Sequence, residues 1–195
     1  WAILNDLSPA ATFISSSLNG SVSASDLDSD YEELVAKVEA KYGWMYQTNH
    51  GDSRTTGEIA YTIWSDVLIC PSCQNDIVFW EEAVDKNELK VLSQFQCPKC
   101  NSTIKKADCP KKMQSFFDQI AGETVSQIKQ VPVVIEYYIG SRKYTKKPDA
   151  LDLERIRRIE NEQIASWVPL LKMTMGERFL KDAFHLMGFS HVHHF

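Results

Sequence analysis

The sequence lacks the features that mark membrane-spanning and secreted proteins. Among its 195 residues no apolar run approaches the ~20 residues that span a bilayer, and no basic start precedes an apolar stretch. Basic residues are in the minority, with 21 Lys and Arg against 26 Asp and Glu, so the formal net charge is −5. We therefore expect a cytoplasmic protein with no membrane partner. This net charge excludes a protein that holds nucleic acid by bulk positive charge, but it is compatible with a local basic face.

The common motifs of catalysis and nucleotide binding are absent as well. The chain holds no Gly-x-Gly-x-x-Gly, no phosphate-binding loop, no nucleophile elbow and no histidine pair at zinc-protease spacing. It has no Pro-Pro pair, and it begins at Trp1 rather than at a methionine. Its hydrophobic fraction of 44% is that of an ordinary globular protein, which buries a core without disulfides. The five cysteines therefore need another explanation.

Hydrophobic periodicity predicts a mixture of helices and strands. A helix is expected over residues 26–42, where apolar and aromatic side chains recur on one face. These are Leu27, Tyr31, Leu34, Val35, Val38 and Tyr42. Gly43 follows at the position of a left-handed helix end. Two more helices are expected, over 10–18 and over about fifteen residues after Pro148. Strands are expected at 1–4, 44–46, 59–64, 77–80, 89–95, 131–138 and 142–146.

Four of the cysteines form a duplicated motif. Cys70-Pro-Ser-Cys73 and Cys97-Pro-Lys-Cys100 are two Cys-Pro-x-Cys turns, here called the first and second knuckle, with 23 residues between them. Two thiolates from each tight turn complete the tetrahedral sulfur site that zinc prefers, and this spacing is typical of a zinc ribbon. Four sulfur ligands leave no open position, so the zinc is expected to be structural. Two disulfides, a redox pair or buried free thiols are the alternatives, which an intracellular duplicated motif disfavours.

The remaining cysteine and the histidines are weaker ligand candidates. Cys109 lies outside both knuckles and is expected to be a spectator thiol, with replacement of one knuckle ligand as the alternative. His191 and His193 alternate as a ligand pair would, and His194 follows, but a solvated strand or tail is the favoured interpretation. His50 is expected on the surface of a loop.

Basic residues gather locally after the second knuckle and around a predicted turn. The first group is Lys99, Lys105, Lys106, Lys111 and Lys112, and the second is Arg142, Lys143, Lys146 and Lys147. Tyrosines at 137, 138 and 144 are interleaved with the second group. Cations neutralise phosphates and tyrosines stack on bases, so a nucleic-acid interface is one interpretation. The candidate residues are Lys99, Lys105, Lys106, Arg142 and Lys143. A solvated charged surface, with the tyrosines in a core, is the other interpretation.

Six segments carry a resemblance to a known family. They are Trp1–Phe13, Ile63–Cys73, Ile77–Trp80, Gln130–Ile135, Lys147–Asp149 and His191–Phe195. In this order they resemble the central part of site-specific DNA methyltransferases, which use S-adenosylmethionine to methylate an exocyclic amino group of adenine or cytosine. The resemblance implies that Asp6, at the end of a strand, binds the cofactor ribose, as acids do in dinucleotide folds. The alternative is that Asp6 only caps the next helix.

Two segments typical of that family have no counterpart here, namely the glycine-rich cofactor loop and a segment of the Asp-Pro-Pro-Tyr type. We therefore expect an internal fragment of the methyltransferase that cannot methylate alone and helps to shape the cleft for the DNA target. The expected fold class is α+β: a strand–helix piece of the α/β methyltransferase sheet (1–24), a helix and β-hairpin (25–66), the four-cysteine zinc ribbon (67–108), a β-rich section (109–148), and a helix with an irregular C-terminal segment (149–195). A free-standing zinc-ribbon adaptor that binds nucleic acid or protein is the alternative.

Overall fold

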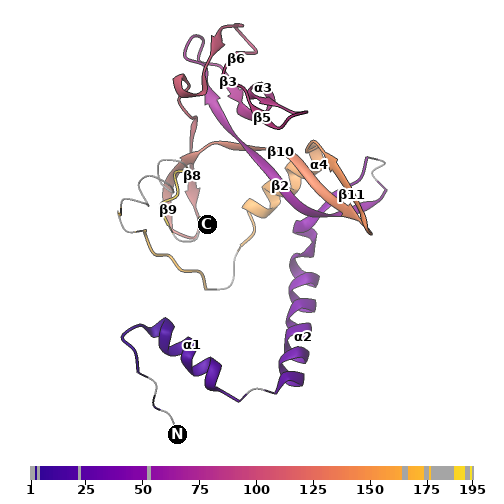
Figure 1. Cartoon of the computed structure of the whole chain (residues 1–195), viewed down its shortest axis with the longest axis vertical. Helices are drawn as coiled ribbons and strands as arrows, with labels where there is room; N and C mark the ends of the chain where they lie inside the picture. Colours follow the sequence, from indigo (N-terminus) through magenta and orange to yellow (C-terminus); the bar gives the residue numbers. More distant parts are fainter. Residues whose placement is uncertain are drawn as a thin grey trace. The chain divides into compact units, whose positions relative to one another are not determined.

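The computed structural model describes residues 3, 5–21, 23–51, 54–163, 167–173, 176, 187–191 and 194. The strand predicted at 1–4 lies mostly outside these residues, and His193 does so entirely. The chain folds as two units, Trp1–Tyr46 and Gln47–Phe195, and each is described by itself (Figure 1). Helices and antiparallel sheets are both present, which confirms the α+β class. No helix among the described residues combines the length and apolar character needed to cross a bilayer.

The first unit contains two helices that begin at side-chain caps. In α1 (Pro9–Asn19) the Oγ of Ser8 accepts a hydrogen bond from the Ala11 amide, and Pro9 occupies the first helical position. In α2 (Ala24–Tyr42) the Oγ of Ser23 accepts from the Asp26 amide. Both helices were predicted to within two residues at each end. Neither buries a side chain within the described structure, although each has an apolar face.

The end of α2 differs from the sequence prediction. Gly43 was expected in the left-handed conformation, but its φ of −54° and ψ of −29° are right-handed. The chain therefore continues as a short 3-10 helix, η1 (Gly43–Tyr46), where a strand was predicted at 44–46. The first strand, β1 (Gln47–Asn49), begins only afterwards.

The second unit is built on an antiparallel sheet in the order β1-β2-β10-β11. Its strands are β1, β2 (Thr56–Ile69), β10 (Gln130–Ile139) and β11 (Arg142–Lys146). Pro132 lies in β10 opposite Trp64 of β2. β11 pairs with β10 only from Ile135 onward, so among the described strands none pairs with β10 on its other side at Pro132, where proline has no amide hydrogen to donate. A register shift follows directly, between Pro132 and Val134. β10 contributes the buried side chains of Val133, Ile135 and Tyr137 to the core.

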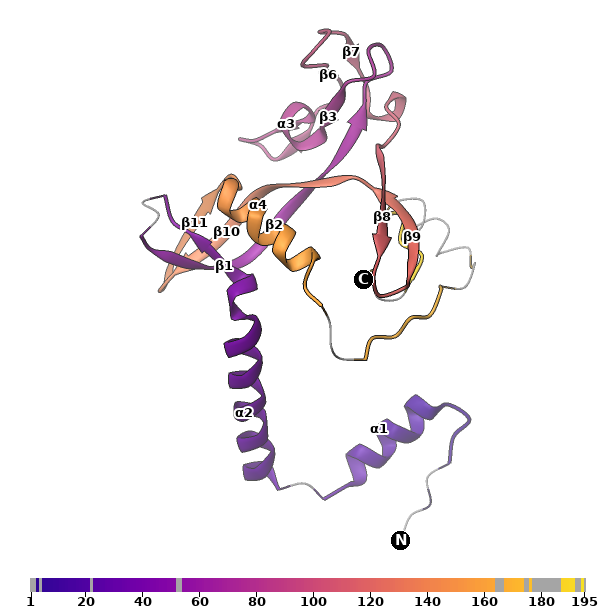
Figure 2. The ribbon, with the colours of Figure 1, turned by 180° about the vertical axis from the view of Figure 1, so that it is seen from behind.

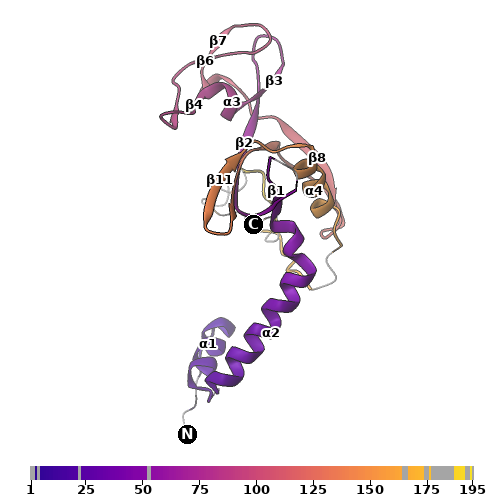
Figure 3. The same cartoon turned by 90° about the vertical axis from the view of Figure 1, so that its right-hand side faces the viewer.

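The far end of β2 leaves this sheet and enters the ribbon. There it pairs with β3 (Asp76–Val78), and the first knuckle is the turn of that hairpin. The following elements are α3 (Phe79–Ala83), β4 (Val84–Asp85), β5 (Lys90–Val91), β6 (Phe95–Gln96), β7 (Thr103–Ile104) and the 3-10 helix η2 (Lys106–Asp108). Figure 3 shows α3, β3, β4, β6 and β7 gathered at this end of β2. The buried cluster of the ribbon comprises Leu68, Cys70, Ile77, Ala83, Phe95, Cys97, Ile104 and Cys109.

Two strand predictions in the ribbon were too long. The run at 77–80 ends as a strand at Val78, because Phe79 and Trp80 open α3. This places the Phe79 ring edge-on against Phe95 in the ribbon core, with centroids 6.2 Å apart. The run at 89–95 is likewise divided between β5 and the start of β6.

Three elements complete the second unit. The hairpin of β8 (Met113–Asp118) and β9 (Glu123–Ile128) was not predicted as separate strands. α4 (Ala150–Glu160) is shorter than the predicted fifteen residues and begins with a reciprocal capping box between Asp149 and Asp152. The buried Thr48 hydroxyl of β1 donates to Asp152 Oδ1 at 2.6 Å, so α4 lies against the sheet beside β1 (Figure 2).

Candidate metal centre

The first knuckle is a tight turn with a defined hydrogen-bond pattern. The Cys70 amide donates to the Asn75 carbonyl at 2.9 Å, and the Gln74 amide donates back to the Cys70 carbonyl at 3.0 Å. Gln74 has a φ of 60°, a left-handed conformation that reverses the chain directly after Cys73. The Sγ atoms of Cys70 and Cys73 lie within 4.8 Å of each other.

The second knuckle repeats this pattern at the same offsets. The Cys97 amide donates to the Ser102 carbonyl at 3.0 Å, and the Asn101 amide donates to the Cys97 carbonyl at 2.9 Å. Asn101 has a φ of 57°, matching Gln74. Sequence reasoning did not identify Gln74, Asn101 or Ser102 as part of the site. The sequence does contain a sign of these residues, because two polar residues directly follow each Cys-Pro-x-Cys turn, at 74–75 and at 101–102.

The structure brings the four sulfur atoms of the two knuckles together. All four lie within 4.8 Å of one another. Two of the pairs join different knuckles, with Cys70 Sγ 3.8 Å from Cys100 Sγ and Cys73 Sγ 3.7 Å from Cys97 Sγ. A tetrahedral site with metal–sulfur bonds of about 2.3 Å has sulfur–sulfur edges of about 3.8 Å. The cluster therefore has the size of a four-thiolate metal site, and all four cysteines are unpaired by disulfides.

The ionisation of the thiols is uneven in this geometry. Burial disfavours the Cys70 thiolate, but hydrogen bonds from the backbone amides of Cys73 and Ser72 outweigh it and lower the pKa of Cys70 to about 6. The Asn75 amide acts in the same sense on Cys73, but burial and the neighbouring thiols raise the pKa of Cys73 to about 12. A hydrogen bond from Ser102 lowers the pKa of Cys100. Four thiolates at these distances need a cation among them.

Cys109 belongs to the ribbon core and not to the four-sulfur cluster. Its side chain is buried, and its thiol donates to the Lys105 carbonyl with an Sγ···O distance of 3.4 Å. Burial raises the pKa of Cys109, which keeps it a neutral thiol. This agrees with the spectator role predicted for it.

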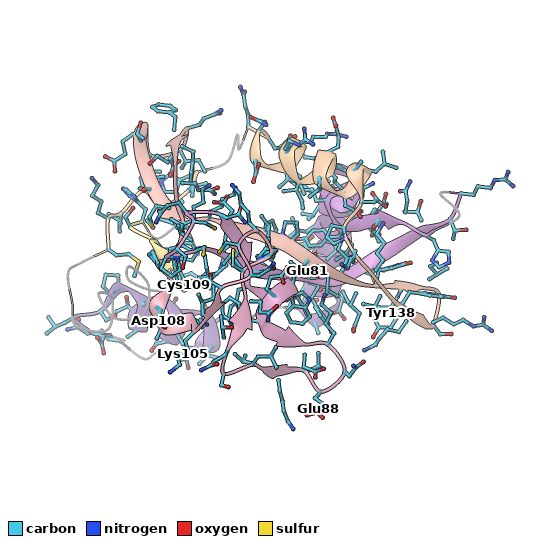
Figure 4. The ribbon with its side chains drawn as sticks, turned by 90° about the horizontal axis from the view of Figure 1, so that it is seen from above. Glu81, Glu88, Lys105, Asp108, Cys109 and Tyr138 are labelled. Carbon is cyan, nitrogen blue, oxygen red and sulfur yellow. The ribbon has the colours of Figure 1, made fainter. Side chains whose placement is uncertain are left out.

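The cations near the second knuckle differ in their environment. Lys99, inside the knuckle, and Lys105, which follows β7, are exposed, and neither forms an ion pair within the part of the chain described here. Figure 4 shows Lys105 near Asp108 and Cys109, at the segment that leads away from the ribbon. The Nζ atom of Lys106 lies 4.2 Å from the centre of the Phe79 ring, a cation–π contact.

Most of the other predicted basic residues are engaged in ion pairs. Lys111 contacts Asp66 at 2.8 Å, and the next residue, Lys112, contacts Asp76 at 2.6 Å. Lys143 contacts the buried Glu136 at 2.9 Å, Lys146 contacts the buried Asp152 at 2.8 Å, and Lys147 contacts Glu81 at 3.1 Å. These lysines are therefore paired with carboxylates of the same chain. Arg142, at the β10–β11 turn, is exposed and has no ion-pair partner among the described residues.

The tyrosines of β10 and β11 divide between core and surface. Tyr137 is buried, stacks on Tyr144 with centroids 5.7 Å apart, and shares a hydrogen bond of 2.7 Å with His50 Nδ1. His50 is therefore half-buried against this pair and not the free surface residue that was predicted. Tyr138 is 41% exposed and faces solvent. Tyr144 is half-buried, so Tyr138 is the exposed one of the three tyrosines near the second basic group.

The described histidines near the C-terminal end are buried, where a solvated tail was predicted. His191 is 3% exposed, and its Nε2 lies 3.5 Å from Glu123 Oε1. His194 Nε2 lies 3.0 Å from Asp118 Oδ2, with both side chains buried. Both imidazoles are thus engaged by carboxylates of the β8–β9 hairpin. Among the described residues the only group close enough to share a metal ion is the four-cysteine cluster.

Asp6, the predicted cofactor ligand, lies in the first unit. Its Oδ1 accepts a hydrogen bond of 2.7 Å from the Ser8 amide, directly before α1. The cap of α1 itself is Ser8, so Asp6 holds the residue before the helix and is not the helix cap given as its alternative. The ribose-binding role stays a prediction.

Comparison with known proteins provides no relative. Protein-family models, curated proteins and solved structures were searched, and none matches this chain. The sulfur cluster and the charges around it are therefore the observations that bear on function.

Proposed function

We propose that the four knuckle cysteines hold a structural zinc ion, and that the chain is a non-catalytic region of an S-adenosylmethionine-dependent DNA amino-methyltransferase that contacts the DNA target. The observation that carries the proposal is the four-sulfur cluster with exposed, unpaired lysines beside it. The resemblance of six segments to that enzyme family supplies the enzymatic context.

The geometry supports zinc as the ion. Zinc has no geometric preference of its own and accepts four thiolates in a tetrahedron, which matches the edges of 3.7 and 3.8 Å. The four ligands occupy every tetrahedral position, so no site is left for water or substrate. Zinc in this position stabilises the ribbon and takes no part in a reaction.

The distribution of paired and unpaired cations supports a role in DNA contact. Lys111 and Lys112 are neutralised by Asp66 and Asp76, whereas Lys99 and Lys105 are exposed on the ribbon without an ion-pair partner among the described residues. A lysine that is not paired with a carboxylate can neutralise a DNA phosphate. The counterions condensed on the DNA are then released, and this release contributes to binding. An enzyme that extrudes a base must hold both flanks of its target, which gives a rigid basic ribbon a role in the cleft.

Metal content and DNA binding test the two parts of the proposal. Purified protein is expected to contain one zinc per chain. Binding to a short DNA duplex is measured by fluorescence anisotropy over a series of salt concentrations. The affinity is expected to fall when Lys99→Gln and Lys105→Gln are combined. Loss of two phosphate contacts lowers the slope of log K against log salt by about two. Lys90→Gln is the matched control, because Lys90 is exposed but paired with Glu88 on the β4–β5 hairpin. Equal effects of the two sets of substitutions would refute the DNA contact at the ribbon.

A free-standing adaptor is the second candidate, and one observation favours it. The ribbon and the main sheet share one compact unit with its own buried core. A region that grips the flanks of an extruded base should bind a duplex with one mismatch more tightly than a perfect duplex, by about threefold or more, since the mismatch lowers the cost of unpairing. An adaptor that reads only the phosphate backbone would bind both duplexes equally.

A further inference from the structure

The apolar face of α2 forms a regular seam that the described structure leaves open. Leu27, Tyr31, Leu34 and Val38 follow one another at intervals of four, three and four residues, the spacing of a coiled-coil seam. They are 58%, 65%, 59% and 49% exposed. A helix of 19 residues gains most of its stability from packing such a face, so a cover for this seam is expected.

The charges of α2 are divided between its two halves. Residues 26–33 carry five carboxylates and no basic side chain. Residues 34–42 carry Lys37 and Lys41 against a single Glu39. Two such helices placed side by side in the same direction bring the acidic halves together and repel. Placed in opposite directions, they bring each acidic half against a lysine-bearing half.

We propose that α2 pairs in antiparallel orientation with α2 of a second copy of this chain. In the register that centres the seam, Leu27 packs against Val38 of the second copy, and Tyr31 packs against Leu34. Asp30 and Lys37 flank the seam and face each other across it, once on each side of the two-fold axis. Lys37 is exposed and pairs with Glu33 one turn before it on the same helix, so its ammonium lies at the surface.

The pairing goes beyond the proposed function and uses none of the ribbon residues. The seam holds two different contacts, Leu27 with Val38 and Tyr31 with Leu34, and the two-fold axis repeats each of them once. Such an interface is small, so the dimer is expected to be weak and its population to depend on protein concentration. Sedimentation equilibrium of the full chain from about 5 to about 500 µM is expected to show the mass rising from the 22.3 kDa monomer toward twice that value.

Substitutions in the seam and beside it test the register. Leu34→Asp places a carboxylate in the centre and is expected to weaken the dimer by about tenfold or more. The side chain is exposed in the single chain, so the far-ultraviolet circular dichroism should keep its helical signal. Asp30→Lys is expected to weaken dimerisation, and the double variant Asp30→Lys with Lys37→Asp is expected to restore it. Glu32→Lys is the matched control, with the same charge change away from the seam.

Three outcomes would overturn the proposal. The chain stays monomeric over the whole concentration range, or Leu34→Asp dimerises as well as the unchanged chain, or the double variant fails to recover what Asp30→Lys loses. Equal weakening by Glu32→Lys and Asp30→Lys would also contradict it, because bulk charge would then explain the result.

Discussion

Removal of the metal is expected to loosen the ribbon without unfolding the main sheet. A metal ion held by the four thiolates would join Cys73 to Cys97 across 24 residues of chain. Closing a loop of this length costs about 3.5 kcal/mol of chain entropy at 25 °C. When a chelator removes the ion, the free energy of the open form of the two knuckles falls by about this amount relative to that of the closed form. A difference of that size is a factor of a few hundred in the opening equilibrium.

Amide hydrogen exchange measures this opening residue by residue. The Gln74 and Asn101 amides, which donate to Cys70 and Cys97, are expected to exchange a few hundred times faster after chelation. The amides of β10 between Ile135 and Tyr138 lie in a stretch that pairs with β2 and β11, and their exchange should be unchanged.

Single cysteine variants provide the control for this experiment. Cys97→Ser should lose the bound metal and show the fast exchange without chelator. Cys109→Ala should keep one metal per chain, because Cys109 is outside the cluster. If the knuckle amides stay equally protected with and without metal, the reasoning is wrong, since hydrophobic packing alone would then hold the two hairpins together.

Three more predictions follow from other parts of the chain. Gly57→Ala should lower the free energy of unfolding by about 1–3 kcal/mol in a denaturant titration, because the added Cβ would lie 2.3 Å from Cδ2 of the buried Tyr137; an unchanged midpoint would show that the ring moves aside freely. Stability should also fall in acid: burial opposes ionisation of Asp66, but Lys111 and Gln130 outweigh it and lower its pKa below the unfolded value. The folded state then binds fewer protons than the unfolded state, so the stability that the Asp66 carboxylate adds is present above about pH 4 and is lost as the pH falls through the lowered pKa. Asp66→Asn should therefore flatten the dependence of the unfolding midpoint on pH below about pH 4. Calorimetric titration with S-adenosylmethionine should show no micromolar binding to this chain, which holds no glycine-rich loop beside Asp6; clear binding would contradict the expected fragment.

Local signals in the sequence were sufficient to predict the knuckles and the first two helices. A Cys-Pro-x-Cys turn depends on four consecutive residues, and its partner is recognised because it repeats the same pattern. Pro9 after Ser8 marks the start of α1, and α2 is recognised from the apolar face that repeats within the helix itself. These features need no knowledge of distant contacts.

The remaining features depend on contacts between residues far apart in the chain. Asp118 meets His194 across 76 residues, so the burial of this histidine could not be read from its polar neighbours. Lysines at 111 and 112 look like part of a basic surface until their partners Asp66 and Asp76 are placed beside them. Periodicity found the apolar face of α2, but the pattern alone does not specify what the face packs against.

The continuous strand β2 has a mechanical consequence. Its 14 residues pair with the main sheet at one end and with β3 of the ribbon at the other, where the strand runs directly into the first knuckle. Near the knuckle, the amide of Val67 donates a hydrogen bond to the Lys129 carbonyl, and the amide of Ile69 donates one to the Pro110 carbonyl. These bonds to neighbouring segments restrict the movement of the strand there. A displacement of the ribbon is therefore passed directly to the main sheet through β2. Trp64 lies on β2 opposite Pro132 and is 43% exposed, so its fluorescence can report such a displacement from a position between the four-cysteine cluster and the main sheet.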